Sequence, residues 1–133
     1  MANGTIAFDT LSTSGQISGT AKSVDADYLS TGSAKAWAQY EHDPIINKGF
    51  NTASITDNAT GDQSITYTNN MDGTAYAVTT SGTIDDSSYQ VFVSVDHDRG
   101  GPRAAGVDLN SVSDGGGFTD AELLSFVSHG DLA

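Results

Sequence analysis

The chain has 133 residues, enough for one domain, and 37% of them are hydrophobic, which is below the usual share for a globular domain. Its formal net charge of −12, with only five Lys and Arg, argues against nucleic-acid binding by phosphate neutralisation and against attraction to an anionic membrane. Cysteine is absent, which excludes disulfides and thiolate metal sites, and no apolar run approaches the ~18 residues of a membrane-spanning helix.

The composition favours short strands joined by many turns. Glycine is frequent, at 15 residues, and proline is rare, at two. Ser, Thr, Asn and Asp are abundant, a mixture more typical of β-structure than of helices. The core is expected to be thin for the chain length, which suggests that part of the apolar surface is buried against another copy or another protein.

Residues 1–31 differ from the rest of the chain in composition and in their weaker strand patterns. Residues 5–8 form a short strand candidate, and residues 12–20 are rich in Ser, Thr and Gly. The segment is therefore expected to be an extended N-terminal arm, or attachment segment, that orders on a neighbour; a strand of the main domain is the alternative. The start lacks the basic and apolar parts of a signal peptide, so no export is expected.

Regular strand patterns begin at residue 33, and residues 32–133 are expected to form one domain. In residues 34–39 alanines alternate with Lys35, Trp37 and Gln39, which predicts a strand with a face of small side chains. Residues 41–44 are a predicted loop because Pro44 lacks a backbone donor, and residues 47–49 are a predicted turn. Residues 50–55 form a predicted strand that pairs with residues 64–68 in a hairpin.

Further strand patterns follow to the C-terminus. Residues 76–80 predict a strand that ends at residues 81–82. Residues 89–95 give the strongest pattern: Val91, Val93 and Val95 share one face and Phe92 points to the other, which indicates burial in a sandwich or at a subunit interface. Residues 96–106 form a predicted polar loop. Short strands are expected at residues 107–109 and 124–127. About eight short strands predict an all-β fold, an antiparallel β-sandwich or jelly-roll-like domain.

Two loops combine histidine with carboxylates and are candidates for surface binding. The candidate residues, with two arginines of the second loop, are Glu41, His42, Asp43, Asp96, His97, Asp98, Arg99 and Arg103. Imidazole and carboxylate groups bind divalent cations. Adjacent side chains on an extended chain point in opposite directions, however, so neither triplet is a clamp by itself and no metal ligands are predicted. The arginines could pair with an acidic partner or compensate charge locally.

The sequence carries no motif of an enzyme. The nucleophile elbow G-x-S-x-G, the zinc motif H-E-x-x-H, the phosphate-binding P-loop and the dinucleotide fingerprint are all absent. We therefore expect a protein without enzymatic activity, catalytic residues or cofactors. Trp37, Tyr40 and Tyr89 could stack on sugar rings or on a protein partner; for Trp37, packing in the core or between subunits is the favoured interpretation.

A longer pattern runs from residue 32 to residue 78. It consists of AKAW (34–37), FN (50–51), SITDN (54–58), TGD (60–62), Met71 and YAV (76–78). The pattern closely resembles a module near the C-termini of bacteriophage tail-fibre and related virion proteins, and residues 126–131 (FVSHGD) resemble the end of that module. The chain differs from the module at Gln39, at Gln63 and in residues 41–48, so the resemblance extends to the fold and not to a shared ligand.

The resemblance implies a non-enzymatic, all-β virion protein, assembled in the host cytoplasm. The first hypothesis is a tail fibre, tail spike or receptor-binding appendage, a homotrimer that is attached to other virion proteins through residues 1–31 and contacts a host glycan or protein. The alternative is a capsid decoration protein, a head fibre or cement protein that bridges shell subunits. No nucleic acid and no membrane insertion are expected. An enzyme that processes carbohydrate is the third hypothesis and the one least favoured by the sequence.

Overall fold

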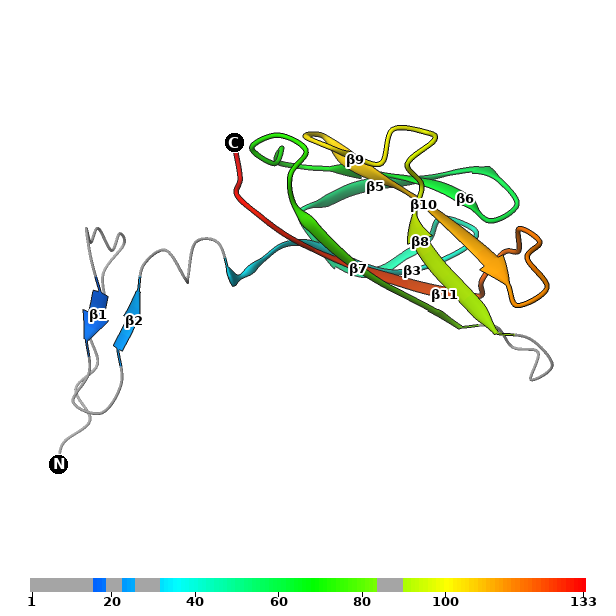
Figure 1. The fold of residues 1–133 in the computed structure, drawn as a ribbon, viewed down its shortest axis with the longest axis horizontal. Helices are drawn as coiled ribbons and strands as arrows, with labels where there is room; N and C mark the ends of the chain where they lie inside the picture. Colours follow the sequence, from blue (N-terminus) through cyan, green and yellow to red (C-terminus); the bar gives the residue numbers. More distant parts are fainter. Residues whose placement is uncertain (1–15, 19–22, 26–31, 84–89) are drawn as a thin grey trace, which may run out of the picture.

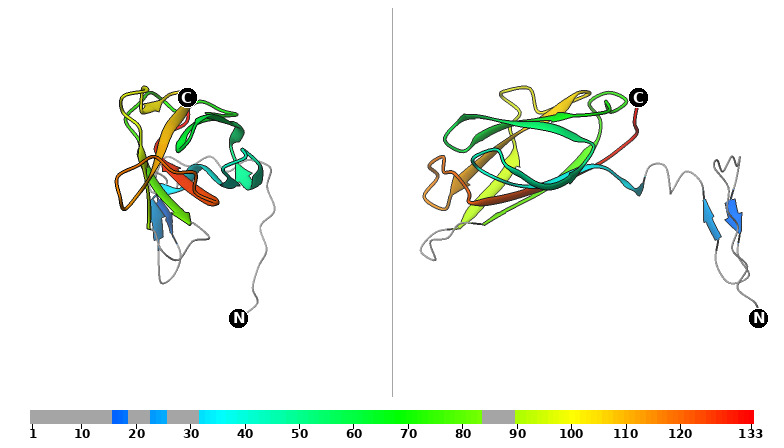
Figure 2. Two further views of the ribbon diagram at one scale, coloured as in Figure 1. Left: turned by 90° about the vertical axis from the view of Figure 1, so that its right-hand side faces the viewer. Right: turned by 180° about the vertical axis from the view of Figure 1, so that it is seen from behind.

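The computed structural model describes residues 16–18, 23–25, 32–83 and 90–133. Every regular element named in these residues is a β-strand. Figures 1 and 2 show that the strands after residue 32 form two layers facing one another. The predicted all-β antiparallel sandwich is therefore confirmed.

The two layers are four- and five-stranded antiparallel sheets. The β3 sheet has the order β4-β3-β11-β7, with bounds β3 Ala34–Glu41, β4 Ile46–Phe50, β7 Ala77–Thr83 and β11 Leu123–His129. The β10 sheet has the order β5-β6-β10-β8, with bounds β5 Thr52–Ala59, β6 Asp62–Tyr67, β8 Val91–Val95 and β10 Gly106–Ser113, and β9 Pro102–Arg103 also pairs with β10. The described part of the chain thus has nine strands in the sandwich, one more than the sequence predicts.

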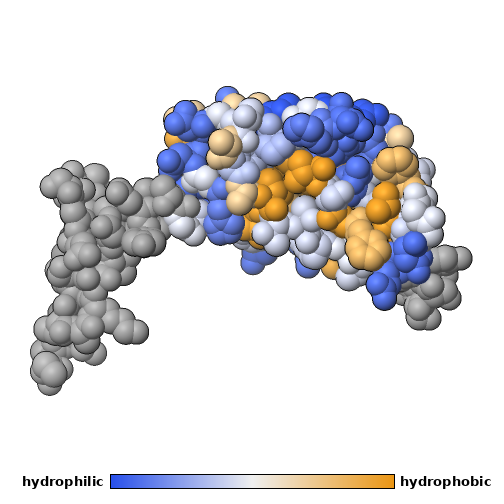
Figure 3. Space-filling view, in the orientation of Figure 1, coloured by the Kyte–Doolittle hydropathy of each residue, from blue (hydrophilic) through white to orange (hydrophobic). Residues whose placement is uncertain are grey.

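The core lies between the sheets and follows from alternation along the strands. In β3, Ala36, Ala38 and Tyr40 are buried and the residues between them are not. The sequence predicts the face of small side chains but not the burial of Tyr40. The same period of two governs β11, where Leu124 and Phe126 point inward. The buried apolar side chains are Ala36, Ala38, Tyr40, Ile55, Ile65, Tyr67, Met71, Val107, Leu109, Ala121, Leu124 and Phe126. Figure 3 shows apolar surface along the side where β7 and β8 lie next to each other, so the core reaches the surface there.

The chain crosses from one sheet to the other at Asn51, which separates β4 from β5. Its backbone is left-handed, with φ of 54°, a conformation that asparagine tolerates better than most residues. The Asn51 amide donates to the carbonyls of Lys35 (2.9 Å) and Asn69 (3.0 Å), and its Oδ1 accepts from the Asn69 backbone N–H (2.6 Å). The continuous strand expected over residues 50–55, and the turn expected over 47–49, are therefore wrong: residues 46–50 are one strand and the bend follows them.

Strand β7 continues past the point where the sequence predicts its end. Gly82 has no side chain, and a Cβ there would lie 2.7 Å from Val93 Cγ2. The glycine therefore marks a close approach between β7 and β8 and not a chain break. β10 is likewise longer than predicted, because residues 106–110 pair with β6 and residues 109–113 pair with β8.

The N-terminal part contributes one pair of short strands. β1 Gln16–Ser18 pairs antiparallel with β2 Ser23–Asp25. The strand candidate at residues 5–8 lies outside the described residues, as does most of the expected N-terminal arm. The attachment role of residues 1–31 stays a prediction.

Candidate functional site

The two histidine-carboxylate triplets belong to different sheets. Glu41 is the last residue of β3 in one sheet and His42 and Asp43 follow it, whereas residues 96–98 follow β8 in the other sheet. Within the described ranges no group of three or more His, Asp and Glu side chains is placed to hold a metal ion. The described geometry therefore gives no support to a cation site built from both loops.

The carboxylate of Asp96 organises its own loop. Its Oδ1 accepts hydrogen bonds from the backbone N–H groups of Asp98 (3.0 Å) and Arg99 (3.3 Å). The Asp96 carbonyl accepts from Gly101 N–H at 2.8 Å, and Gly101 has a left-handed φ of 56°. This is the local turn chemistry of an aspartate.

The two arginines of this loop compensate charges on the outer face of the β10 sheet. Arg99 Nε lies 2.5 Å from Asp62 Oδ2, and Arg103 Nη1 pairs with Asp108 Oδ2. Asp108 is 1% exposed, and its second oxygen accepts from Ser64 Oγ at 2.7 Å. Of the two interpretations open from the sequence, the structure shows local charge compensation.

The other triplet borders a hollow at one end of the β3 sheet. Its volume is about 420 Å³, and the lining residues are Glu41, His42, Thr83, Glu122 and Leu123. His42 Nε2 lies 3.2 Å from Asp43 Oδ1, and His42 Nδ1 is a buried atom without a hydrogen-bond partner. The hollow brings two carboxylates, Glu41 and Glu122, near the imidazole of His42.

The aromatic candidates divide between the core and the outer face. Tyr40 points inward, is fully buried and donates to Gln63 Oε1 at 3.1 Å, so its proposed role in stacking on a ligand is wrong. Trp37 is half-buried on the outer face of the β3 sheet, directly opposite Phe50 of β4. Tyr89 lies outside the described residues.

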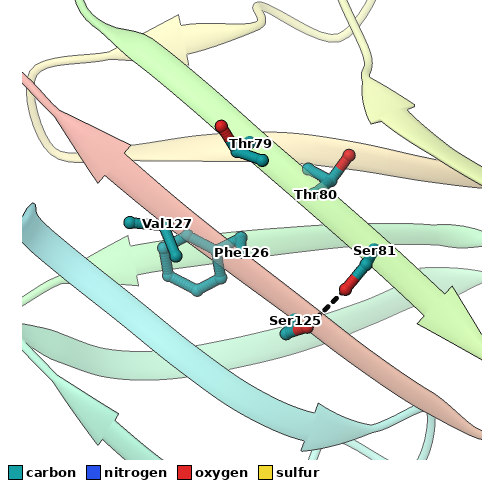
Figure 4. A pocket seen from close by; sticks show the side chains of 6 residues that line it. All are labelled: Thr79, Thr80, Ser81, Ser125, Phe126 and Val127. Carbon is teal, nitrogen blue, oxygen red and sulfur yellow. Dashed lines mark hydrogen bonds between the residues drawn. The ribbon is translucent and has the colours of Figure 1, made fainter.

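The outer face of the β3 sheet also carries a shallow hollow between β7 and β11. Figure 4 shows its hydroxyl-bearing and apolar side chains, with a hydrogen bond of 2.7 Å between Ser81 Oγ and Ser125 Oγ. Its volume is about 100 Å³, well below the roughly 300–1,000 Å³ of ligand pockets. The hollow is therefore surface relief and not a pocket for a small molecule.

A buried cluster of hydroxyl groups closes the end of the sandwich near the C-terminus. Tyr76 OH donates to the carbonyls of Gly106 (2.6 Å) and Arg103 (3.0 Å), and Tyr67 OH lies 2.8 Å from Ser128 Oγ. Burial raises the pKa of both tyrosines and, at the other end of the core, the pKa of Tyr40. These hydroxyls are structural, because the protein keeps them neutral and satisfied.

Stability is expected to fall as the pH rises above about 10, the ordinary tyrosine pKa. In the folded protein the pKa of Tyr40, Tyr67 and Tyr76 is raised, so above this pH the unfolded state loses protons that the folded state retains. Each such tyrosine can lower the free energy of unfolding by at most about 1.4 kcal/mol per pH unit, and the partly exposed Tyr76 contributes less. Urea denaturation between pH 8 and 11.5 measures the slope, and Tyr67→Phe should reduce it. A midpoint that is unchanged between pH 9 and 11 would contradict the prediction.

No protein-family model, curated protein or solved structure matches this chain. Among the described residues no helix is long and apolar enough to cross a membrane. The residues and their contacts must therefore carry the functional interpretation.

Two apolar rows on the outer faces were not predicted as units. Phe50, Trp37 and Val127 lie side by side across β4, β3 and β11. Phe92, Val112 and Phe118 lie side by side across the β10 sheet. The sequence does place Trp37 and Phe92 opposite the buried faces of their strands. It gives no signal for the cross-strand neighbours, since these depend on pairing between distant segments.

Proposed function

We propose that this chain is a non-enzymatic structural protein of a bacteriophage virion, acting in a tail fibre, tail spike or receptor-binding appendage. The observation that carries the proposal is that the residues resembling the virion module make architectural contacts. Asn51 forms the corner between the sheets, and Tyr76 ties β10 to the chain end. The residues of the pattern therefore hold the fold together. This is the role expected of residues in a module that structural proteins share.

The turn between β5 and β6 supports the same interpretation. Gly61 has a left-handed φ of 67°, and a Cβ there would lie 2.4 Å from the Ser111 carbonyl oxygen. Its N–H donates to Asp120 Oδ1 at 2.7 Å, and its carbonyl accepts from Ser111 N–H at 2.8 Å. The Thr-Gly-Asp part of the pattern thus joins the hairpin turn to the segment after β10.

The Gly-Asp ending has a comparable explanation. A Cβ on Gly130 would lie 2.6 Å from Tyr76 Cβ, so only glycine fits beside that ring. The carbonyl of Asp131 accepts from Asp72 N–H at 2.8 Å, and Leu132 bridges to Met71. The end of the chain is therefore held by backbone contacts against the segment between β6 and β7. That segment contains Met71 of the pattern and leads into its Tyr-Ala-Val part.

The location of the protein in a phage particle tests the proposal. Immunogold labelling with an antibody raised against this chain, combined with a particle reconstruction, should place it on the tail appendage. The same antibody should reduce adsorption to host cells, and an antibody against the major capsid protein serves as the control. Label on the capsid shell alone would support the alternative of a decoration protein. Absence from the particle would refute both.

A further inference from the structure

Two aspartates of the described residues stand directly before a glycine in an exposed turn. Asp72 precedes Gly73 and Asp114 precedes Gly115, and all four residues are exposed. The backbone nitrogen of the residue after an aspartate can attack the side-chain carboxyl, and a glycine leaves that nitrogen unshielded because it has no Cβ. Figures 1 and 2 show the two turns at opposite ends of the sandwich, the first near the C-terminus and the second after β10. A third pair able to react in this way, residues 3–4, lies outside the described residues.

The turn at Asp72 holds the nitrogen of its glycine in place. Gly73 N–H donates to the Met71 carbonyl at 2.9 Å. Asp72 N–H donates to the Asp131 carbonyl at 2.8 Å. Met71 is 1% exposed, and its own N–H donates to the Ala104 carbonyl at 2.8 Å, so the residue before Asp72 is anchored in the core. Attack by the Gly73 nitrogen would therefore break a hydrogen bond in a segment that has little freedom to move.

The turn at Asp114 leaves the corresponding nitrogen free. Gly115 N–H donates to no described residue. Gly116 N–H donates to the Ser113 carbonyl at 2.9 Å, which makes Asp114 and Gly115 the two central residues of a β-turn. Rotation of the peptide between the central residues converts one turn type into another and leaves the closing hydrogen bond intact. The Gly115 nitrogen can therefore turn toward the Asp114 carboxyl without any loss of structure elsewhere.

We propose that Asp114 isomerises spontaneously to isoaspartate in the folded protein and that Asp72 is protected from this reaction. The Gly115 nitrogen forms a bond to Asp114 Cγ, the nitrogen loses its proton, and one carboxyl oxygen leaves as water. The product is a succinimide ring, which water then opens. Cleavage between the nitrogen and the Asp114 carbonyl carbon gives isoaspartate, whereas cleavage between the nitrogen and Cγ restores aspartate. Water is the co-reactant of the second step, and no group is oxidised or reduced.

The isomer differs from the original turn in its backbone and not in its charge. The main chain becomes longer by one carbon atom, and the former backbone carboxyl becomes the side-chain carboxylate. β10 ends at Ser113, so its pairing with β6 and β8 does not include the modified residue. The effect is expected to be confined to the turn and to the bridge between Val112 and Phe118 that follows it. Circular dichroism of the isomerised chain should therefore match that of fresh protein.

Peptide mapping of the full chain during storage at physiological temperature and neutral pH tests the proposal. Trypsin cleaves after lysine and arginine, so Asp72 and Asp114 fall on separate peptides, residues 49–99 and 104–133. Enzymatic methylation detects isoaspartate, and fragmentation of the labelled peptide in a mass spectrometer locates it. The initial rate at Asp114 should exceed the rate at Asp72 by about fivefold or more, because a single hydrogen bond changes a rate by about that factor.

The chain unfolded in guanidinium chloride is the control for the effect of the fold, and there the two sites should react at similar rates. Asp114→Glu should leave the peptide 104–133 almost unlabelled, because glutamate would have to close a larger and less favourable ring. Gly115→Ala should slow the reaction, because the added Cβ shields the nitrogen.

Equal rates at the two sites in the folded chain overturn the proposal, as does faster reaction at Asp72 or no reaction at Asp114. Labelling of the peptide 104–133 that survives Asp114→Glu also overturns it, as does a ratio of rates that the unfolded chain reproduces. The reaction is independent of the location on a particle, so this result and the labelling of virions can fail separately.

Discussion

Replacement of Gly106 by alanine is expected to abolish folding. Gly106 begins β10 and pairs with Thr66 of β6. An added Cβ would lie 1.9 Å from the Ile65 carbonyl oxygen. That atom is backbone in a central strand, so no side chain can move to relieve the clash, and the paired strands must separate. The shift would also disturb the hydrogen bond from Tyr76 OH to the Gly106 carbonyl. A loss of about 4 kcal/mol or more is expected, comparable with the whole stability of a small domain.

Gly115→Ala is the matched control for this substitution. In the turn after β10, the atom nearest to an added Cβ is Ser113 Oγ at 3.8 Å, and Gly115 has no left-handed φ. Alanine there should change the free energy of unfolding by less than about 1 kcal/mol and could raise it by restricting the unfolded chain. Soluble yield, circular dichroism and urea denaturation compare the two. Equal melting of Gly106→Ala and the unmodified chain would show that β6 and β10 are not packed as described.

The sequence predicts the fold best for strands that have one buried face and one solvent-exposed face. The strand from Ala34 is recovered because its side chains alternate cleanly, and β11 confirms the short strand expected over residues 124–127. β4 was missed since four of its five residues are exposed and Gly49 resembles a turn residue. Gly49 is instead small because an added Cβ would lie 2.9 Å from the Trp37 carbonyl oxygen. Local composition cannot distinguish a glycine that bends the chain from one that permits close packing.

The candidate surfaces show the same division between local and distant information. Alternation places Trp37 opposite the alanine face of β3 and Phe92 opposite the valine face of β8, and the structure has both side chains on outer faces. Their exposure was not predicted, because the sequence favours packing for Trp37 and burial for both faces of residues 89–95. The partners Phe50, Val127 and Val112 follow only from the strand order, in which β11 enters between β3 and β7 and β10 between β6 and β8. The ion-pair partners of Arg99 and Arg103 likewise follow only from the fold. Asp62, the partner of Arg99, is on a distant strand, and a turn separates Arg103 from its partner Asp108.

Arg103→Ala is expected to destabilise the protein by about 2–4 kcal/mol, the second largest effect. Asp108 is almost fully buried in β10, and Arg103 supplies the cation that compensates its carboxylate. Without Arg103, Ser64 Oγ is the one side-chain donor to this carboxylate that remains among the described residues, and an uncompensated buried charge is costly. The Arg103 side chain is 40% exposed, which places the loss below that of a fully buried pair.

Arg99→Ala is the comparison that separates burial from charge, because it removes the same side chain from the same loop. Arg99 is 49% exposed and its partner Asp62 is more accessible than Asp108. Asp62 is itself largely buried, with 12% of its side chain exposed, so the cost should be smaller than for Arg103→Ala but still about 1 kcal/mol, at the upper end for partly exposed pairs. Adding Asp108→Asn to Arg103→Ala should restore part of the lost stability, since the buried group is then neutral. Urea denaturation at pH 7 measures all three. Equal losses for the two arginine variants, or no rescue by the asparagine, would mean that Arg103 acts through packing of its side chain and not through its charge.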